Sequence, residues 1–353
     1  MKDVAIIGAG MAGLVCAQQL SQAGYSVLIV EKSRGLGGRV ATRRLHDTFA
    51  DHGACYLKPK DEITTRFAEL LCQHNVLKVW DGIFIEETVS GDIISPSTPC
   101  RYIAPQGMSS IAKFLSKGLN ILLNQRVIAI NQTPEKWCLT VEGNNEEITA
   151  KALVVAIPAP QALALLQPLA TTLNTKFINK LASVEFFPSI SVMAGYSPTC
   201  QPLPEWNAVT LLSEILVWIG YDSSKRINAS QPTFVVQSNL NFAQTHLETP
   251  DLQPVAQQML QVAASAVKFP WLSTPEWMQV HRWRYAFPEN PLEETFLTAE
   301  TSLPLVCCGD WCGGNLIAGA MHSGIAAANQ INSQLDKHVI NESNFLNLLS
   351  NNS

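Results

Sequence analysis

A chain of 353 residues is long enough for two domains, because a single hydrophobic core stops growing near ~250 to 300 residues. Its net charge of −5 gives no basic surface for nucleic acid or for an anionic membrane. No apolar run reaches the ~18 residues of a membrane span, and the N-terminus lacks the basic start and cleavage site of a signal peptide. We therefore expect a cytoplasmic enzyme without a nucleic-acid or membrane partner.

Residues 2–31 predict a strand, a tight turn, a helix and a second strand that ends on Glu31. The glycines of the turn have separate roles in this order. Gly8 permits the turn, Gly10 lets the backbone approach a pyrophosphate, and Gly13 lets helix and strand pack closely. Because strand, helix, second strand and acidic residue are all present, the stretch predicts a dinucleotide-binding unit.

The start of the predicted helix, at Met11 and Ala12, should bind the pyrophosphate. Unpaired N–H groups and the positive end of the helix dipole meet there. At the end of the second strand, Glu31 is placed to accept hydrogen bonds from a ribose, with Lys32 beside it. The charge of Glu31 would repel a 2′-phosphate. The motif alone does not separate FAD from NAD.

A loop rich in glycine and arginine follows this unit and contains Gly38 and Arg39. Together, residues 8–13, Glu31 and residues 34–39 resemble the FAD-binding signature of the amine oxidase and phytoene desaturase superfamily. Within that superfamily the chain looks most like the renalase-like proteins of bacteria and plants. The resemblance implies noncovalent FAD, with the second glycine loop near its phosphates and ribityl end.

The same resemblance implies further cofactor contacts along the chain. Small residues of a "D-x-G-A" segment would lie against the flavin ring, a strand backbone would pair with the adenine, and a closing "G-D" turn would bind a ribityl hydroxyl. A following helix start would face the flavin pyrimidine, where its dipole favours the reduced anion. In order, these positions are Gly53 and Ala54, Val127, Gly309 and Asp310, and Gly319 and Ala320.

Three side chains are candidates for the substrate site. His52 is a possible base, although a histidine beside an aspartate more often forms a structural pair with it. Trp283 and Arg284 lie in a segment of alternating polar and aromatic residues, and the renalase-like proteins carry a similar Trp-Arg-Tyr segment. The competing interpretation is a strand with Trp283 packed on one side and the arginines in solvent.

The predicted fold class is α/β: a Rossmann-type FAD-binding domain in a two-domain, p-hydroxybenzoate hydroxylase-like architecture, with a substrate domain of mixed β-sheet and helices. We assign residues 1–60, 101–160 and 281–335 to the FAD-binding domain and residues 61–100 and 161–280 to the substrate domain. Residues 336–353, rich in Asn and Ser, predict a flexible tail.

The resemblance implies an oxidase that takes hydride from isomeric dihydronicotinamides, 2- or 6-dihydroNAD(P), and gives NAD(P)⁺ and hydrogen peroxide. Its partners would be a small reduced nicotinamide dinucleotide and molecular oxygen. A flavin amine oxidase is the alternative, although its usual aromatic pair and lysine cannot be located in the sequence; Lys58 and Lys60 lie in a proline-containing turn.

The nine cysteines show no paired spacing, and no histidines stand at ligand spacing, so we predict reduced thiols and no metal site. Cys307, Cys308 and Cys312 fall in one apolar strand and turn. Two alternatives depend on them: a non-enzymatic redox-sensing flavoprotein, and a covalent flavin on Cys312. Apolar neighbours favour buried, inert thiols instead.

Overall fold

A computed structural model describes residues 1–87, 93–94, 100–143, 147–314, 316–335, 338–340 and 346. Most of the predicted tail at 336–353 lies outside these residues, as do residues 88–92 and 95–99 of the predicted substrate domain. Among the described residues, no helix combines the length and apolarity that crossing a membrane requires.

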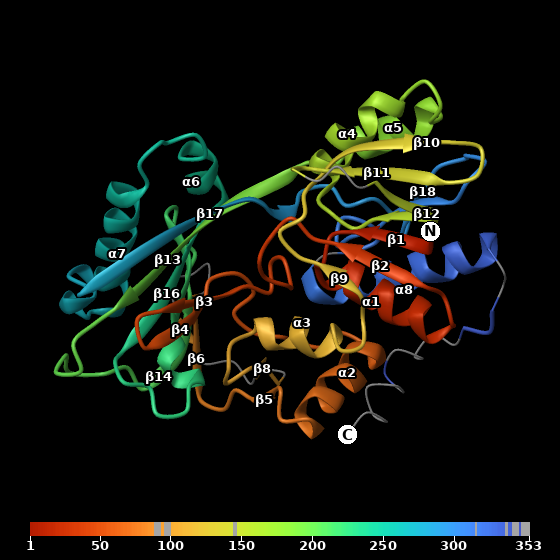
Figure 1. Cartoon of the computed structure of the whole chain (residues 1–353). Coiled ribbons are helices and arrows are strands. Elements are labelled where there is room, and N and C mark those ends of the chain that lie inside the picture. Colours follow the sequence, from red (N-terminus) through yellow and green to blue (C-terminus); the bar gives the residue numbers. More distant parts are fainter. Residues whose placement is uncertain are drawn as a thin grey trace.

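The first of two main sheets carries the N-terminal unit (Figure 1). Its central strands run parallel, and an antiparallel meander forms one edge. The strand order is β10 (Val127–Gln132), β11 (Trp137–Val141), β12 (Ile148–Val155), β1 (Lys2–Ile7), β2 (Val27–Val30) and β9 (Ile121–Leu122), with β19 (Leu305–Cys307) paired to β12 and β18 (Leu297–Thr298) paired to β19.

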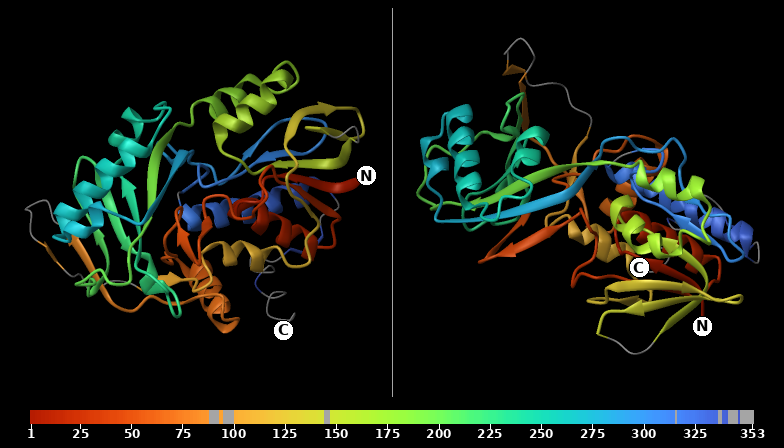
Figure 2. Two further views of the ribbon diagram at one scale, coloured as in Figure 1. Left: turned by 60° about the vertical axis from the view of Figure 1, so that its left-hand side comes forward. Right: turned by 90° about the horizontal axis from the view of Figure 1, so that it is seen from above.

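The second main sheet is mixed and lies beside the first (Figure 2). Its order is β17 (Trp277–Pro288), β13 (Phe186–Gly195), β16 (Thr233–Ser238), β15 (Leu216–Tyr221), β14 (Trp206–Thr210), β6 (Ile83–Glu87) and β7 (Ile93–Ile94). Two small antiparallel pairs, β3 (Thr42–Leu45) with β4 (Thr48–Asp51) and β5 (Lys78–Val79) with β8 (Tyr102–Ile103), complete the strands of the described residues.

Helices cover both sheets. In chain order they are α1 (Met11–Gln22), α2 (Glu62–Gln73), α3 (Ser109–Leu115), α4 (Ala159–Leu166), α5 (Thr175–Ala182), α6 (Leu240–Thr245), α7 (Gln253–Val267) and α8 (Leu316–Gln334), with 3-10 turns η1 (Gln167–Leu169), η2 (Asp222–Lys225) and η3 (Pro270–Ser273). The α/β fold class predicted from the sequence, with a Rossmann-type unit and a second mixed sheet, is confirmed.

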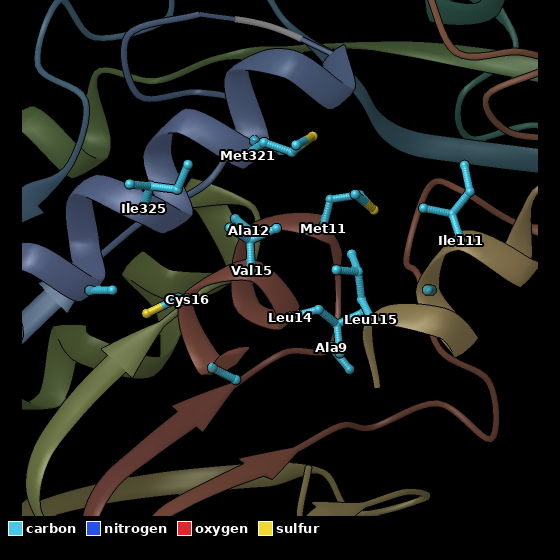
Figure 3. Packing of buried hydrophobic residues seen from close by; sticks show 14 of the residues in the cluster. Ala9, Met11, Ala12, Leu14, Val15, Cys16, Ile111, Leu115, Met321 and Ile325 are labelled. Carbon is cyan, nitrogen blue, oxygen red and sulfur yellow. The ribbon is translucent and has the colours of Figure 1, made fainter. Parts of the chain in front are cut away.

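Helices α1 and α8 pack closely on the first sheet. In Figure 3, side chains of α1, α3 and α8 meet in one apolar cluster. A Cβ atom on Gly324 would lie 2.4 Å from the carbonyl oxygen of Ala12, so glycine at this position lets the two helix backbones touch.

Helix α2 begins at a capping box in which Asp61 accepts from the backbone N–H of Thr64. Its buried face, with Phe67 and Leu71, joins the apolar core that also contains α1 and α3. Helices α4 and α5 likewise pack on the other face of the first sheet. The predicted domain limits assign residues 61–100 and 161–280, and with them most of these three helices, to the substrate domain. In the structure the three helices pack with the first sheet. The domain limits themselves stay a prediction.

The second sheet has two different faces. One packs against α7 through residues such as Ile190 and Val192 of β13. Because side chains alternate along a strand, the residues between them point the other way, and Met193 packs there with Leu45 and Ala50 of the β3–β4 hairpin. We call this second side the inner face, because it meets segments that continue from the dinucleotide unit (Figure 1).

Candidate functional site

The turn after β1 has the geometry that the glycine motif predicts. Gly8 has a φ of +104°, which favours glycine, and a Cβ on Gly13 would lie 2.1 Å from the carbonyl oxygen of Gly8. A Cβ on Gly10, in contrast, would meet nothing within 4 Å. Gly10 caps α1 without a side-chain hydrogen bond, so the N–H groups at Met11 and Ala12 begin the helix beside an open space. This cradle fits a pyrophosphate.

The second glycine loop lies directly against the first. The N–H of Gly37 donates to the carbonyl oxygen of Ala9 at 2.9 Å, and a Cβ on Gly38 would lie 3.5 Å from the Cα of Gly10. The two glycine segments, which are separated along the sequence, therefore form one cradle. Its walls have no side chain at Gly10 and Gly38, which suits the close approach of a phosphate.

Glu31 stands at one end of this cradle. One carboxylate oxygen accepts from the N–H of Ala9 and the other from the N–H of Ser33, each at 2.8 Å. Each oxygen keeps a second acceptor position for a hydroxyl. Beyond it, Lys32 lines a polar hollow of about 490 Å³ with Ser33, Asn124, Arg126 and Glu142. Val127, the residue after Arg126, begins β10, the edge strand of the sheet.

Arg39 joins three parts of the site. Its guanidinium binds both carboxylate oxygens of Asp310 at 2.6 Å and also donates to the carbonyl oxygen of Ala286 at 3.0 Å. Asp310 is only 3% exposed. The resemblance implied that this aspartate binds a ribityl hydroxyl, and the structure adds an arginine that fixes its orientation.

Gly53 has a different reason to be small from the one predicted. A Cβ there would lie 2.0 Å from the carbonyl oxygen of Arg39, and the N–H of Ala54 donates to that same oxygen at 2.9 Å. A contact between two backbones thus requires the glycine, independently of a flavin ring. It also holds the 53–54 segment against the loop that carries Arg39.

The start of α8 is equally compact. A Cβ on Gly319 would lie 2.8 Å from the carbonyl carbon of Gly314, and the N–H of Gly309 donates to the hydroxyl of Ser323 at 2.9 Å. Ala320 is buried beside them. The closing turn and the helix start therefore touch; Asn315, between them, lies outside the described residues.

His52 does not pair with Asp51. The two side chains enter different clusters, as alternation along β4 and its continuation predicts. The His52 ring stacks on Trp283 with centroids 5.3 Å apart and meets His281 edge-on at 4.8 Å, while the indole N–H of Trp283 donates to the carbonyl oxygen of His52 at 2.8 Å. Trp283 and His52, both sequence candidates, are thus in contact.

Burial keeps both histidines neutral near pH 7. It lowers the pKa of His52 to about 3, helped by His281 and by the charge of Arg43. It lowers the pKa of His281 to about 4, again with Arg43. The Nδ1 atom of His52 is buried and has no hydrogen-bond partner among the described residues. An unpartnered buried nitrogen of this kind fits a ligand that supplies the missing bond.

A row of polar side chains crosses the inner face at one register. His281 pairs with Ser191, Ser191 with Gln237, and Gln237 with Trp218, across β17, β13, β16 and β15. The amide nitrogen of Gln237 donates to the carbonyl oxygen of Gly53 at 2.9 Å. Within the described part of the chain, the Ser191 hydroxyl and the Trp218 indole nitrogen are buried without partners. We call these four residues the polar row.

Four buried charges form a cluster that the sequence did not reveal. The ammonium of Lys225 lies 2.6 Å from Asp222 and 3.3 Å from Asp51, and the guanidinium of Arg226 contacts the same two carboxylates. All four side chains are at most 4% exposed. The cluster connects β4 with η2 at the end of β15, so it links the β3–β4 hairpin to the second sheet.

Arg284 lies outside this site. Its guanidinium forms a two-pronged pair with Glu248, and 43% of its side chain is exposed. The pattern in the sequence, with Trp283 on one side of the strand and the arginine on the other, is thus observed.

The three cysteines near the last strand have the character of inert thiols. Cys307, Cys308 and Cys312 are buried. Burial raises the pKa of Cys308 to about 12 and raises the pKa of the other two further. Thiolates are the reactive form, so these groups do not fit a redox sensor.

These features define an α/β protein with a dinucleotide cradle next to a second, mixed sheet. The model of the family "Flavin containing amine oxidoreductase" matches residues 76–332, and that of the "NAD(P)-binding Rossmann-like domain" matches residues 6–70. The chain therefore belongs to the flavin containing amine oxidoreductase family. The predicted FAD cofactor and oxidoreductase class are confirmed at this level.

Individual relatives match over a short stretch. The L-amino acid oxidase Cdc18 of Crotalus durissus cumanensis is 44% identical over 66 residues, 19% of this chain and 13% of that protein. The L-amino acid dehydrogenase of Synechocystis sp. is 36% identical over 75 residues, 21% of this chain and 15% of that protein. The chain thus matches only about 13 to 15% of the length of these curated relatives.

Solved structures match over nearly the whole fold. Putrescine oxidase bound to putrescine has a TM-score of 0.70 at 15% identity, covering 94% of this chain and 99% of that one. Cyclohexylamine oxidase from Brevibacterium oxydans IH-35A has a TM-score of 0.69 at 15% identity, covering 95% and 99%. At such low identity the likeness concerns the fold.

Proposed function

We propose that this chain is a renalase-like oxidase that takes hydride from isomeric dihydronicotinamides, such as 2- or 6-dihydroNAD(P). A bound flavin supplies hydride acceptance and reaction with oxygen. The net reaction converts dihydronicotinamide, oxygen and a proton into NAD(P)⁺ and hydrogen peroxide. The resemblance of the chain to the renalase-like proteins, which carry a Trp-Arg-Tyr segment similar to residues 283–285, first suggests this substrate class.

The polar row is the observation that supports it best. A nicotinamide carries a neutral carboxamide, which both donates and accepts hydrogen bonds. The row offers a hydroxyl at Ser191, beside His281, and an indole N–H at Trp218, two strands further along; both are unpartnered among the described residues. Its four members are neutral at pH 7, so they suit an amide better than an ammonium group.

We assign substrate seating to His52 and Trp283. Their stacked rings give a rigid aromatic wall at the end of the polar row, and the unpartnered Nδ1 of His52 provides one hydrogen bond. His52 is neutral near pH 7, so it can bind without moving a proton. No side-chain base is needed for hydride transfer.

Cofactor binding is assigned to the cradle and to the segments around it. The glycine turns admit the phosphates, Glu31 and Lys32 meet the ribose, Val127 meets the adenine, and the closing turn and helix start meet the flavin. The full set is Gly8, Gly10, Met11, Ala12, Gly13, Glu31, Lys32, Gly38, Arg39, Gly53, Ala54, Val127, Gly309, Asp310, Gly319 and Ala320.

The first test is anaerobic mixing of the FAD-bound protein with dihydronicotinamide isomers. We expect 2- or 6-dihydroNAD(P) to bleach the flavin on the order of a hundredfold faster than 4-dihydroNAD(P)H or primary amines, because a pocket that seats one ring isomer displaces the reactive carbon of another. Stopped-flow absorbance measures the rates. Trp283→Ala should slow the bleaching, and Arg284→Ala should leave it unchanged.

Two results would contradict this proposal. Fast bleaching by monoamines, with inert dihydronicotinamide isomers, would favour the amine oxidase. Unchanged bleaching in Trp283→Ala would remove that residue from the substrate seat.

A second prediction concerns attachment of the cofactor. Cys312 is buried and burial raises its pKa, so a thioether to FAD is not expected. Acid precipitation should release all of the yellow chromophore into the supernatant, where its absorbance is measured. Colour that remains with the precipitated chain, and is lost in Cys312→Ala, would show a covalent bond.

Amine oxidation is the second candidate. Family membership favours it, and the rings of Tyr56 and Trp218 lie 5.5 Å apart on the inner face. The buried Lys225 is bound by Asp51 and Asp222, however, so its ammonium is already occupied.

A further inference from the structure

Arg101 is a buried cation that is only partly paired with negative charge. The residue is 5% exposed, and its guanidinium carbon lies 4.0 Å from the ring centre of Phe84 and 5.4 Å from that of Tyr56. Its Nη2 atom donates to Glu86 at 3.2 Å, and the Glu86 side chain is 39% exposed. The Nε and Nη1 atoms are buried and have no hydrogen-bond partner among the described residues.

A third unpartnered donor belongs to the same aromatic cluster. The indole N–H of Trp218 is buried without a partner, and its ring lies 5.5 Å from that of Tyr56, on which Arg101 also rests. All three of these atoms donate hydrogen bonds, and none of them accepts. A group that only accepts, namely an oxyanion, complements such a set.

Two other buried cations of this fold are paired with buried carboxylates, as expected for charges with a structural role. Lys225 and Arg226 each contact the buried carboxylates of Asp51 and Asp222, although the Nε atom of Arg226 also has no hydrogen-bond partner among the described residues. Because an unpaired buried charge is destabilising, full pairing is what stability alone favours. Arg101 contacts only the partly exposed carboxylate of Glu86 among the described residues and leaves two of its nitrogens without partners, so its charge is paired less completely than theirs.

Arg101 also lies beside the substrate site. Its neighbour Tyr102 forms a two-way backbone bridge with Leu57, each N–H donating to the other's carbonyl oxygen at 2.8 Å. The bridge holds Arg101 against the segment that begins at Gly53. Trp218, in turn, is a member of the polar row.

We infer that Arg101, with the indole N–H of Trp218, binds an oxyanion of the substrate, a phosphate or a carboxylate. The inference rests on the proposed function for the location of the substrate along the polar row. In a dihydronicotinamide nucleotide this oxyanion is a phosphate. In an amino-acid substrate it is a carboxylate.

Ligand titrations of the FAD-bound protein, followed by changes in flavin absorbance, separate these sources. Nicotinamide mononucleotide and nicotinamide riboside differ by one phosphate, and benzoate and benzamide differ by one charge. We expect the mononucleotide to bind at least about tenfold more tightly than the riboside. Arg101→Gln should remove this difference by weakening the binding of the mononucleotide alone. The exposed Arg66→Gln is the matched control and should change neither.

The outcomes distinguish this inference from the proposed function. An Arg101-dependent preference for benzoate alone would support the oxyanion site with a carboxylate, while counting against a dihydronicotinamide nucleotide. No preference in either pair, or a preference that survives Arg101→Gln, would overturn the inference.

Thermal unfolding gives a readout independent of ligands. Arg101→Met removes a poorly paired charge and keeps an apolar side chain between the rings, so its melting temperature should be equal to or higher than that of the native chain. Arg101→Lys retains the charge and should keep part of the mononucleotide preference. Loss of folding in the Gln, Met and Lys variants would make Arg101 a structural residue and would overturn the inference.

Discussion

Asp51→Asn should lower the free energy of unfolding by about 3 to 5 kcal/mol, the cost of removing one partner from a buried ion-pair network. Asp51 is fully buried and accepts from Arg226 at 2.7 Å, from the hydroxyl of Thr42 at 2.7 Å and from the N–H of Met108 at 2.8 Å. Asparagine keeps the shape but leaves two cations, Lys225 and Arg226, with the single carboxylate of Asp222.

Urea unfolding followed by circular dichroism, with FAD in excess, measures this loss. Asp3→Asn is the matched control, because Asp3 pairs with Lys151 at 2.8 Å at the surface, where their side chains are 25% and 47% exposed. A surface pair contributes at most about 1 kcal/mol. Equal effects of the two substitutions would mean that the buried cluster does not stabilise the fold.

The same network sets a dependence on acid. Burial alone would raise the pKa of Asp51, but the charges of Lys225 and Arg226 outweigh it and hold that pKa below its ordinary value. The stabilisation by Asp51 is therefore complete above the pKa of the unfolded chain, near 4, and is lost as the pH falls through the lower pKa of the folded state. Asp51→Asn should remove this part of the acid sensitivity.

The sequence could predict the cofactor cradle because its geometry is local. Gly8, Gly10 and Gly13 lie in one strand, turn and helix, and their spacing defines the turn that the structure contains. The residue type at Gly53 was also informative, but for another reason: it contacts the backbone of Arg39, a packing relation that a single segment does not show.

The polar side of the site could not be predicted, because its residues meet only through the pairing of distant strands. Asp51 and Lys225 are separated by 174 positions. The D-x-G-A segment that contains Asp51 gives no sign of the cations that this aspartate binds. Ser191 and Trp218 belong to strands whose register depends on the whole second sheet. The candidate Trp283 was found from the alternating pattern of its segment together with a family resemblance, and neither showed its contact with His52.

The second large effect is expected from the two neutral histidines. Their pKa values in the fold, about 3 for His52 and about 4 for His281, are below the ordinary value of 6.5 because burial disfavours the charged ring. Below pH 6.5 the unfolded chain therefore binds protons that the folded chain does not. Stability is complete above pH 6.5 and falls by about 1.4 kcal/mol per pH unit for each such histidine as acid is added.

His52→Phe tests this loss directly, because it keeps a ring stacked on Trp283 and removes the group that titrates. For His52 alone the loss amounts to about 3 kcal/mol at pH 4.5, relative to pH 7. Urea midpoints from pH 4.5 to 7, with FAD in excess, should therefore depend on pH less steeply in His52→Phe, by close to one proton. The native chain, measured in the same series, provides the reference slope. A slope that His52→Phe leaves unaltered would mean that the ring is protonated in the fold, and a neutral His52 could then no longer be part of the proposed substrate seat.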